Sequence, residues 1–201
     1  MLKILKILPL IYIFLIIKVY SEDFLYKKNY KNLDGTYNAI IEIPAGDSIK
    51  YEISKDGKNI NEKIENSKVR IIDYLPYPFN YGFIPSTILP QNNGSDLLDI
   101  IVIGPRVDRG TILKVRPIGT LVLLDKNKID LKVIAVSLNE TSLSNINNIN
   151  ELEKNFIGIL DIIKLWTINY KGEILELKRV LKKKDTIEII ENYHKAFLEK
   201  N

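Results

Sequence analysis

The acidic side chains best placed to do chemistry gather where turns meet hydrophobic strands. Asp96 and Asp99 precede the apolar run Ile100–Ile103, and Asp125 and Asp130 flank the turn of an expected hairpin and face each other across its mouth. Each pair alone is typical of a turn, but four carboxylates held together repel one another unless a cation separates them. Carboxylate ligands suit hard ions such as Mg²⁺, Mn²⁺ or Ca²⁺ rather than zinc. The pattern predicts a site for a hard divalent cation.

Cationic and phenolic side chains occur at positions that could hold the anion accompanying such a cation. Lys50 and Glu52 are two residues apart on an expected strand and therefore share one face. The prolines and glycine of segment 75–85, LPYPFNYGFIP, fix a sharply turned backbone that presents Tyr77 and Tyr81. A buried phenol can donate a hydrogen bond to a phosphoryl oxygen. The alternatives are an ordinary ion pair on a solvated strand and aromatic packing beneath a rigid loop.

Two common kinds of site find no support in the composition. The single histidine, His194, lies far in sequence from the acidic pairs, so we interpret it as a surface or core residue and do not expect a histidine-based triad. The chain has no cysteine, which excludes disulfides and thiolate metal sites.

The first 21 residues have the pattern of a targeting segment. Lys3 and Lys6 precede the uninterrupted apolar run Ile7–Ile17, which is shorter than the roughly 20 residues of a membrane span. We expect a signal peptide cleaved after Ser21, with an uncleaved N-terminal anchor as the alternative. Either way the protein is expected to be exported, and to be periplasmic or membrane-tethered. Without Lys3, Lys6 and Lys18, 26 basic residues face 25 acidic ones, so net charge gives no support to general polyanion binding.

The remaining chain divides into a linker or arm, residues 22–37, and one domain, residues 38–201. Its first part consists of short apolar runs separated by turn residues, which is typical of a small barrel or sandwich. Helical spacing follows over 149–166, and Asp185 or Thr186 can cap a last helix that ends near Leu198. We predict a mainly β fold with α, in which two helices pack outside a barrel. The apolar runs are Ala39–Ile43, Ile49–Ile53, Val69–Ile72, Ile100–Ile103, Ile112–Val115, Leu121–Leu124 and Val133–Val136.

Five segments of the chain, in order, are similar to those of the family I soluble inorganic pyrophosphatases, and nearest to their exported branch with long loops. They are IEIPAG with KYE, R-x-x-D-x-LPYPxNYGFIP, SDLLDIIVIG, VRPIGxLxLLD with D-x-K-x-IAV, and LWTINYKG. Together they cover roughly residues 38–172. The resemblance implies a closed five-stranded β-barrel of the OB type with helices outside it. It also implies hydrolysis of pyrophosphate to two phosphates by a metal-activated water.

The resemblance assigns roles to individual residues. Asp96 matches the general base, and Glu42 and Tyr77 match residues that border the site. The implied cofactor is Mg²⁺, with Mn²⁺ as an alternative, and the implied partner is pyrophosphate. We expect no nucleic-acid partner, membrane contact only with an uncleaved N-terminus, and possible homo-oligomers. The matched metal ligands are Glu52, Asp99, Asp125 and Asp130, and the matched substrate-binding residues are Lys50, Arg70, Tyr81, Lys132, Tyr170 and Lys171.

One departure from the family pattern leaves two alternatives open. The signature D-x-D-P-x-D is matched here by 94–99, with Gly94 in place of its first aspartate and Leu97 in place of its proline. The chain could therefore be a catalytically weak or inactive relative that binds pyrophosphate, polyphosphate or metal. A third hypothesis is a module that binds single-stranded nucleic acid or oligosaccharide, for which the basic residues Lys178, Arg179 and Lys182–Lys184 are the only clustered candidates.

Overall fold

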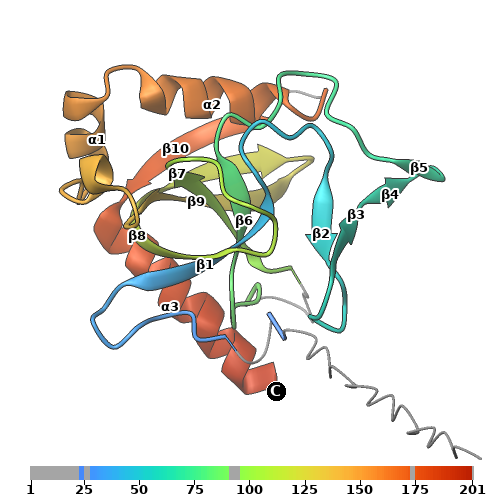
Figure 1. Ribbon diagram of the computed structural model, residues 1–201, viewed down its shortest axis with the longest axis horizontal. Helices are drawn as coiled ribbons and strands as arrows, with labels where there is room; N and C mark the ends of the chain where they lie inside the picture. Colours follow the sequence, from blue (N-terminus) through green and yellow to red (C-terminus); the bar gives the residue numbers. More distant parts are fainter. Residues whose placement is uncertain (1–22, 25–27, 91–95, 173–174, 201) are drawn as a thin grey trace, which may run out of the picture.

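The computed structural model describes residues 23–24, 28–90, 96–172 and 175–200. Its main sheet contains β1 (Tyr37–Ile43), β6 (Asn80–Ile84), β7 (Leu98–Ile103), β8 (Ile112–Asp125), β9 (Lys128–Ser137) and β10 (Glu176–Lys182). The first five form a ring in the order β1, β6, β7, β9, β8, because β1 also pairs with β8 (Figure 1). The β7–β9 pair is parallel and the other pairs of the ring are antiparallel. The fold is therefore mainly β, as the sequence predicts.

Strand β8 joins two apolar runs that the sequence pattern separates. Ile112–Val115 and Leu121–Leu124 belong to one strand of 14 residues, with an irregularity in its pairing to β9 between Pro117 and Gly119. Proline lacks the donor that a regular ladder requires, so it is tolerated at such a bulge. A Cβ atom at Gly119 would lie 2.7 Å from Ile149. The absence of a side chain at Gly119 therefore leaves room for Ile149 and for the backbone of Leu181.

Strand β10 and the region between β1 and β6 differ from the expected pattern. β10 pairs with β8 outside the ring and was not expected as a strand. Segment 75–85 was expected only as a turned backbone, but its second half is β6, which is entirely buried. Two short ladders project beside the ring (Figure 1): β2 (Tyr51–Ile53) with β3 (Ile60–Glu62), and β4 (Ile64–Glu65) with β5 (Lys68–Val69). We call residues 50–70 the projecting arm.

The helices number three in the described part of the chain, rather than two. The helical pattern over 149–166 is divided into α1 (Ile149–Asn155) and α2 (Ile159–Asn169), since Gly158 takes a φ of +82° between them. Asn148 caps α1 through its side chain, which accepts a bond from the Glu151 backbone. The last helix, α3 (Lys183–Lys200), is confirmed and begins slightly earlier than expected. A single-turn 3₁₀ helix, Thr141–Leu143, precedes α1.

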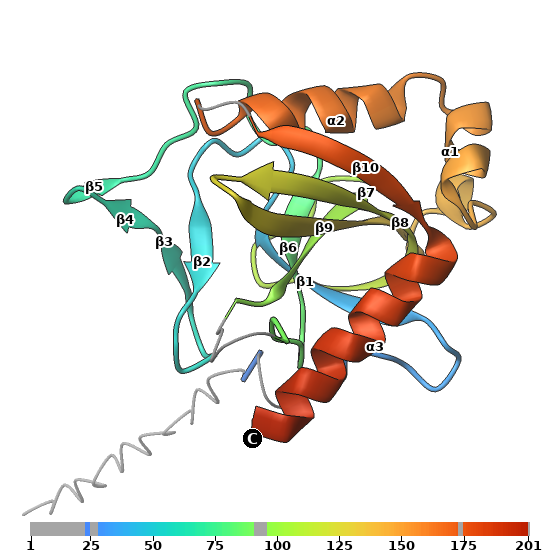
Figure 2. The same ribbon diagram turned by 180° about the vertical axis from the view of Figure 1, so that it is seen from behind.

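The helices cover opposite faces of the sheet (Figures 1 and 2). Alternate residues of β7 point to different apolar clusters: Ile101 packs with residues of α1 and α2, and Ile100 packs with residues of α3. Both clusters consist mainly of buried Ile, Leu and Val. The two layers hold the strand ends in fixed positions, which is what a polar site between them requires.

No helix within the described ranges is long and apolar enough to cross a membrane. The expected signal peptide or anchor, residues 1–21, lies outside the described residues.

Candidate active site

Lys132 is the centre of a buried polar cluster and is only 2% exposed. Its Nζ atom lies 2.8 Å from Oδ2 of Asp99 and 3.1 Å from Oδ1 of Asp130. The fold explains both contacts, because Asp99 is the register partner of Lys132 across β7 and β9, and Asp130 precedes Lys132 by two residues on the same strand face. Burial would lower the pKa of Lys132, but Asp99 and the other negative groups raise it well above its usual value.

Tyr81 completes this cluster from β6. Its hydroxyl donates to Oδ2 of Asp99 at 2.5 Å and accepts from Nζ of Lys132 at 3.0 Å. Burial, and then the negative charge of Asp99, raise the pKa of Tyr81 well above its usual value. Burial alone would raise the pKa of Asp99, but Lys132 and Lys50 lower it. The cluster therefore contains an ionised carboxylate and a neutral phenol.

Lys171 forms a second contact between the acidic residues. Its Nζ atom lies 2.6 Å from Oδ2 of Asp125 and 3.7 Å from Oδ2 of Asp130. The predicted hairpin is present, with Lys126 and Asn127 as its two turn residues, both at positive φ. Asp125 and Asp130 both lie at the hairpin mouth, as expected, but they are not register partners: Asp125 pairs with Lys128, and Asp130 pairs with Leu123. The two aspartates share a face diagonally, so one lysine approaches both.

A buried glutamate lies behind the cluster. Glu42, on β1, is 5% exposed, and its Oε1 accepts a 2.7 Å hydrogen bond from the backbone N–H of Ile53. Burial raises the pKa of Glu42 to about 7, with Lys50 lowering it and Asp99 raising it. The ammonium of Lys50 lies 4.9 Å from the ring centre of Tyr81. Glu42 and Lys50 thus lie in the field of the Asp99 cluster, as the sequence comparison implies.

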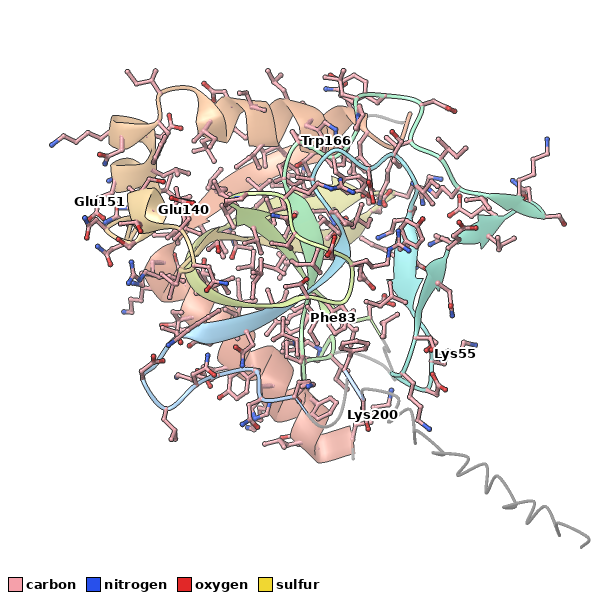
Figure 3. All side chains as sticks on the ribbon, in the orientation of Figure 1. Lys55, Phe83, Glu140, Glu151, Trp166 and Lys200 are labelled. Atoms are coloured by element: carbon pink, nitrogen blue, oxygen red, sulfur yellow. The ribbon has the colours of Figure 1, made fainter. Side chains whose placement is uncertain are left out.

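Aromatic side chains form one wall of the site. Trp166, on the face of α2 that is turned toward the strands (Figure 3), stacks on Tyr170 with 4.6 Å between ring centres. Its indole N–H donates to the carbonyl of Leu75 at 2.8 Å, which ties α2 to the segment before β6. Tyr77 packs 4.5 Å from Trp166 and is 1% exposed. Within the described residues its hydroxyl is a buried polar atom without a hydrogen-bond partner. The wall therefore contains one phenol able to take a polar ligand.

The projecting arm carries a chain of alternating charges that connects two expected site residues. Glu52 accepts from Lys63 at 2.7 Å, Lys63 approaches Glu65 at 3.5 Å, and Glu65 accepts from Arg70 at 3.0 Å. Arg70 also lines one pocket together with Tyr170 and Lys171. Lys63 and Glu65 were not expected at the site. The alternation of acidic and basic residues along 62–70 is the only sequence signal that could have indicated them.

Asp96 is the expected site residue that the described contacts do not join to the cluster. Its side chain is exposed, and its backbone carbonyl accepts a hydrogen bond from Leu89 at 2.9 Å. Burial, and then the negative charges of Asp99, Asp130 and Asp96, raise the pKa of Tyr193 to about 12, so Asp96 lies within electrostatic range of the same tyrosine as two of the other aspartates. The predicted convergence holds for Asp99, Asp125 and Asp130 through their shared lysines. Gly94 lies outside the described residues.

The acidic side chains of the cluster are oxygen donors of the kind that a divalent cation requires. No three acidic or histidine side chains in the described part of the chain form a ready metal-binding group. Mg²⁺, however, is usually held by one or two carboxylates together with water and substrate phosphates. Asp99 and Asp130 both contact Lys132, and Asp125 and Asp130 both approach Lys171, so pairs of oxygen donors already face shared positive charges. The donor chemistry fits a hard cation bound by aspartate pairs.

Comparison with known proteins gives a consistent result. A family model described as inorganic pyrophosphatase matches residues 39–198. An inorganic pyrophosphatase of Drosophila melanogaster is 35% identical over 159 residues, which cover 71% of this chain and 47% of that protein. One from Nanoarchaeum equitans is 37% identical over 169 residues, covering 78% of this chain and 97% of that protein. The chain thus spans about half the length of some curated relatives and nearly all of another.

Solved structures show the same similarity. The type I inorganic pyrophosphatase from P falciparum has a TM-score of 0.81 and 27% identity, over 88% of this chain and 63% of that chain. A truncated Trypanosoma cruzi vacuolar soluble pyrophosphatase in complex with PPi has a TM-score of 0.77 and 26% identity, over 90% and 77%. An inorganic pyrophosphatase from Coxiella burnetii has a TM-score of 0.72 and 27% identity, over 85% of this chain and 99% of that chain.

Proposed function

This chain belongs to the inorganic pyrophosphatase family, and from that premise we propose that it hydrolyses inorganic pyrophosphate to two phosphates. One observation carries the proposal: the 2%-exposed Lys132 contacts Asp99, Asp130 and Tyr81 at once, on three strands of the ring. Burying that many ionised groups is costly unless they are paired or hold a ligand. A metal-dependent hydrolase of a polyanion needs such a mixed set of carboxylates, ammonium groups and phenols.

The cations bind and orient the substrate. Pyrophosphate carries up to four negative charges, and Lys132, Lys171 and Lys50 offer point charges toward its oxygens. Arg70, which lines a pocket with Tyr170 and Lys171, can bind two oxygens of one phosphate in parallel. Tyr170 can donate a hydrogen bond to a phosphoryl oxygen, and Tyr81 can do so only by giving up the hydrogen bond that it donates to Asp99. These contacts stabilise the charge that collects on the departing phosphate.

The carboxylates have two roles in the proposed reaction, to hold the cation and to accept a proton. Asp99, Asp130, Asp125 and Glu52 would hold Mg²⁺, or Mn²⁺ in its place. A bound divalent cation neutralises substrate charge and lowers the pKa of a water. Asp96 accepts the proton of the attacking water as general base. The water oxygen bonds to one phosphorus, the bridging P–O bond breaks, and the bridging oxygen leaves with the second phosphate.

The strand ring and the N-terminal segment support two further parts of the proposal, a closed barrel and export of the protein. The ring of five strands, with a parallel pair and a bulged long strand, supports its interpretation as a closed barrel of the OB type. The basic residues and apolar run of 1–21 support export from the cytoplasm, with the domain periplasmic or tethered to the membrane, as in the exported branch of the family.

Phosphate release tests the proposed function. The full chain is incubated with magnesium pyrophosphate, and phosphate is measured beside an Asp96→Asn variant, which keeps the shape of the side chain but removes its basicity. We expect turnover by the wild type and a loss of at least about 100-fold in the variant, the lower end of what a general base contributes. Equal, measurable rates for the two proteins would refute the role of Asp96, and no phosphate release by the wild type with either Mg²⁺ or Mn²⁺ would refute the proposed reaction.

A further inference from the structure

The loop that carries Asp96 is attached to the C-terminal helix. The loop between β6 and β7 is described at residues 85–90 and 96–97, and the C-terminal half of α3 lies beside its first part (Figure 2). The backbone N–H of Ile88 donates to the carbonyl of Tyr193 at 3.1 Å. Nδ1 of His194 lies 2.8 Å from the carbonyl oxygen of Ser86. Because a carbonyl oxygen can only accept, Nδ1 must carry the proton of this hydrogen bond.

One face of the His194 ring is covered by Tyr30, which belongs to the N-terminal segment 28–37. The ring of Tyr30 stacks on His194 with 3.8 Å between ring centres and an angle of 21°. The hydroxyl of Tyr30 donates to Glu191, one turn earlier on α3, at 2.8 Å, and Lys31 pairs with the same carboxylate at 2.9 Å. The hydroxyl of Ser86 donates to the carbonyl of Lys28 at 2.9 Å. The N-terminal segment 28–37, helix α3 and the start of the β6–β7 loop thus meet around the imidazole ring of His194.

Ser86 needs such support because its backbone conformation is unfavourable. Its φ is +53°, in the left-handed region that residues with a side chain occupy at a cost of roughly 1–3 kcal/mol. A residue remains in this conformation only where its surroundings fix it. The hydrogen bond from His194 and the bond to Lys28 hold the carbonyl and the hydroxyl of Ser86 respectively.

The position of Ser86 is transmitted to Asp96 over a short path. Thr87 accepts a hydrogen bond from the backbone N–H of Leu98 at 3.3 Å, which closes the loop near its base. Leu89 donates its N–H to the carbonyl of Asp96 at 2.9 Å. A shift of Ser86 would therefore also move Leu89, to which the Asp96 backbone is hydrogen-bonded.

We propose that His194 is a positioning residue for Asp96: its Nδ1–H holds Ser86, and Ser86 fixes the side of the loop that binds the Asp96 backbone. The proposal rests on the proposed function for its catalytic consequence, since Asp96 is the expected general base. A side chain that only stabilises the fold would instead affect unfolding without acting through Asp96.

A double-mutant cycle separates these two roles. His194→Phe keeps a ring that can stack on Tyr30 but removes the N–H donor, and His194→Asn restores a donor without the ring. We expect His194→Phe to lower kcat about 10-fold with a smaller change in KM, as for the loss of a supporting partner, and His194→Asn to recover part of it. Asn192→Ala, an exposed change on the same helix, should leave kcat unchanged. In the Asp96→Asn background His194→Phe should cause no further loss; an equal loss there, or wild-type kcat for His194→Phe, would overturn the proposal.

Amide hydrogen exchange provides a readout that does not depend on activity. In His194→Phe the amide of Leu89 should exchange at least several-fold faster, while that of Val133 in β9 stays protected. If the wild type fails to hydrolyse pyrophosphate, the proposed function is refuted, and faster exchange at Leu89 still supports His194 as the support of the Asp96 loop. Unchanged exchange at Leu89 in His194→Phe, or in His194→Ala where the phenylalanine variant does not fold, would overturn the positioning role whatever the activity.

Discussion

The Nζ atom of Lys132 lies 2.8 Å from Oδ2 of Asp99, in a pair whose lysine side chain is 3% exposed and whose aspartate side chain is 32% exposed. The two residues are register partners on the parallel strands β7 and β9. This contact joins the two acidic segments of the sequence, and it makes Asp99 an ionised group inside a mainly apolar fold.

Removing the ammonium should destabilise the protein as well as inactivate it. Lys132→Met leaves the carboxylates of Asp99 and Asp130 without their shared cation, and breaking a buried pair costs roughly 3–5 kcal/mol. Because Asp99 is partly exposed, we expect about 3 kcal/mol, the lower end of that range, measured by urea denaturation at neutral pH without divalent ions. Lys128→Met, at an exposed position of the same strand, is the control. A loss no larger than that of the control would mean that the pair is not a buried ionic contact.

Glu42 should make the free energy of unfolding depend on pH, and the Glu42→Gln variant should lack this dependence. The folded protein raises the pKa of Glu42 to about 7, whereas an unfolded glutamate titrates near pH ~4.3. The folded state therefore binds the extra proton, and the stability from this group, present near pH 4, is lost as pH rises through about 7. Glu42→Gln should gain about 3 kcal/mol relative to wild type between pH 4 and pH 8, measured by urea denaturation in metal-free buffer.

The control for this comparison is Glu62→Gln, an exposed glutamate on the projecting arm. Its stability relative to wild type should not change over the same pH range. A Glu42→Gln difference that stays flat with pH would show that Glu42 is ionised in the folded protein.

The ion pair between Arg70 and Glu65 should compete with substrate binding. Glu65 is 45% exposed, so the pair is worth no more than about 1 kcal/mol. Glu65→Gln should therefore tighten binding of the non-hydrolysable analogue imidodiphosphate by up to about 5-fold. The single tryptophan, Trp166, stacks on Tyr170 and should report binding by its fluorescence. Glu62→Gln removes the same charge from the same arm and is the control; equal effects of both changes would indicate general electrostatics instead.

Replacing Gly94 with aspartate should improve binding of the cation. The sequence resembles the D-x-D-P-x-D signature except at this position and at Leu97. A partner of a bound metal is typically worth about 10–100-fold in affinity or activity, so Gly94→Asp should lower the Mg²⁺ concentration for half-maximal rate by about 10-fold or more. Gly94→Asn has nearly the same shape without the charge and should have a smaller effect. Identical Mg²⁺ dependence of both variants and wild type would exclude a ligand role for this position.

Much of the fold and part of the site could be predicted from the sequence. The short apolar runs between turn residues located β1, β7 and β9, and the spacing in the last helix located α3. The division of the expected helix into α1 and α2 depends on the positive φ of Gly158, which helical periodicity does not register. β10 was missed because its exposed residues, Lys178 and Arg179 among them, mask a strand whose stability comes from pairing with β8.

The site could be predicted only as far as motif matching reaches. Asp99, Asp130 and Lys132 meet because of strand register, which no single segment reveals. The pairing of Glu52 with Lys63, and of Arg70 with Glu65, depends on how the projecting arm folds back on itself. His194 was expected to be a surface or core residue without a role at the site. Its contacts with Tyr30 and Ser86 could not be predicted, because they join positions more than 100 residues apart.

The most direct measurement follows pyrophosphate by ³¹P NMR in ¹⁸O-enriched water with the full chain and Mg²⁺. Attack by water on one phosphorus predicts that the pyrophosphate signal is replaced by phosphate alone, with a single ¹⁸O atom in one of every two phosphates formed. A pyrophosphate signal that persists unchanged with both Mg²⁺ and Mn²⁺, while the protein is folded, would contradict the account at its centre.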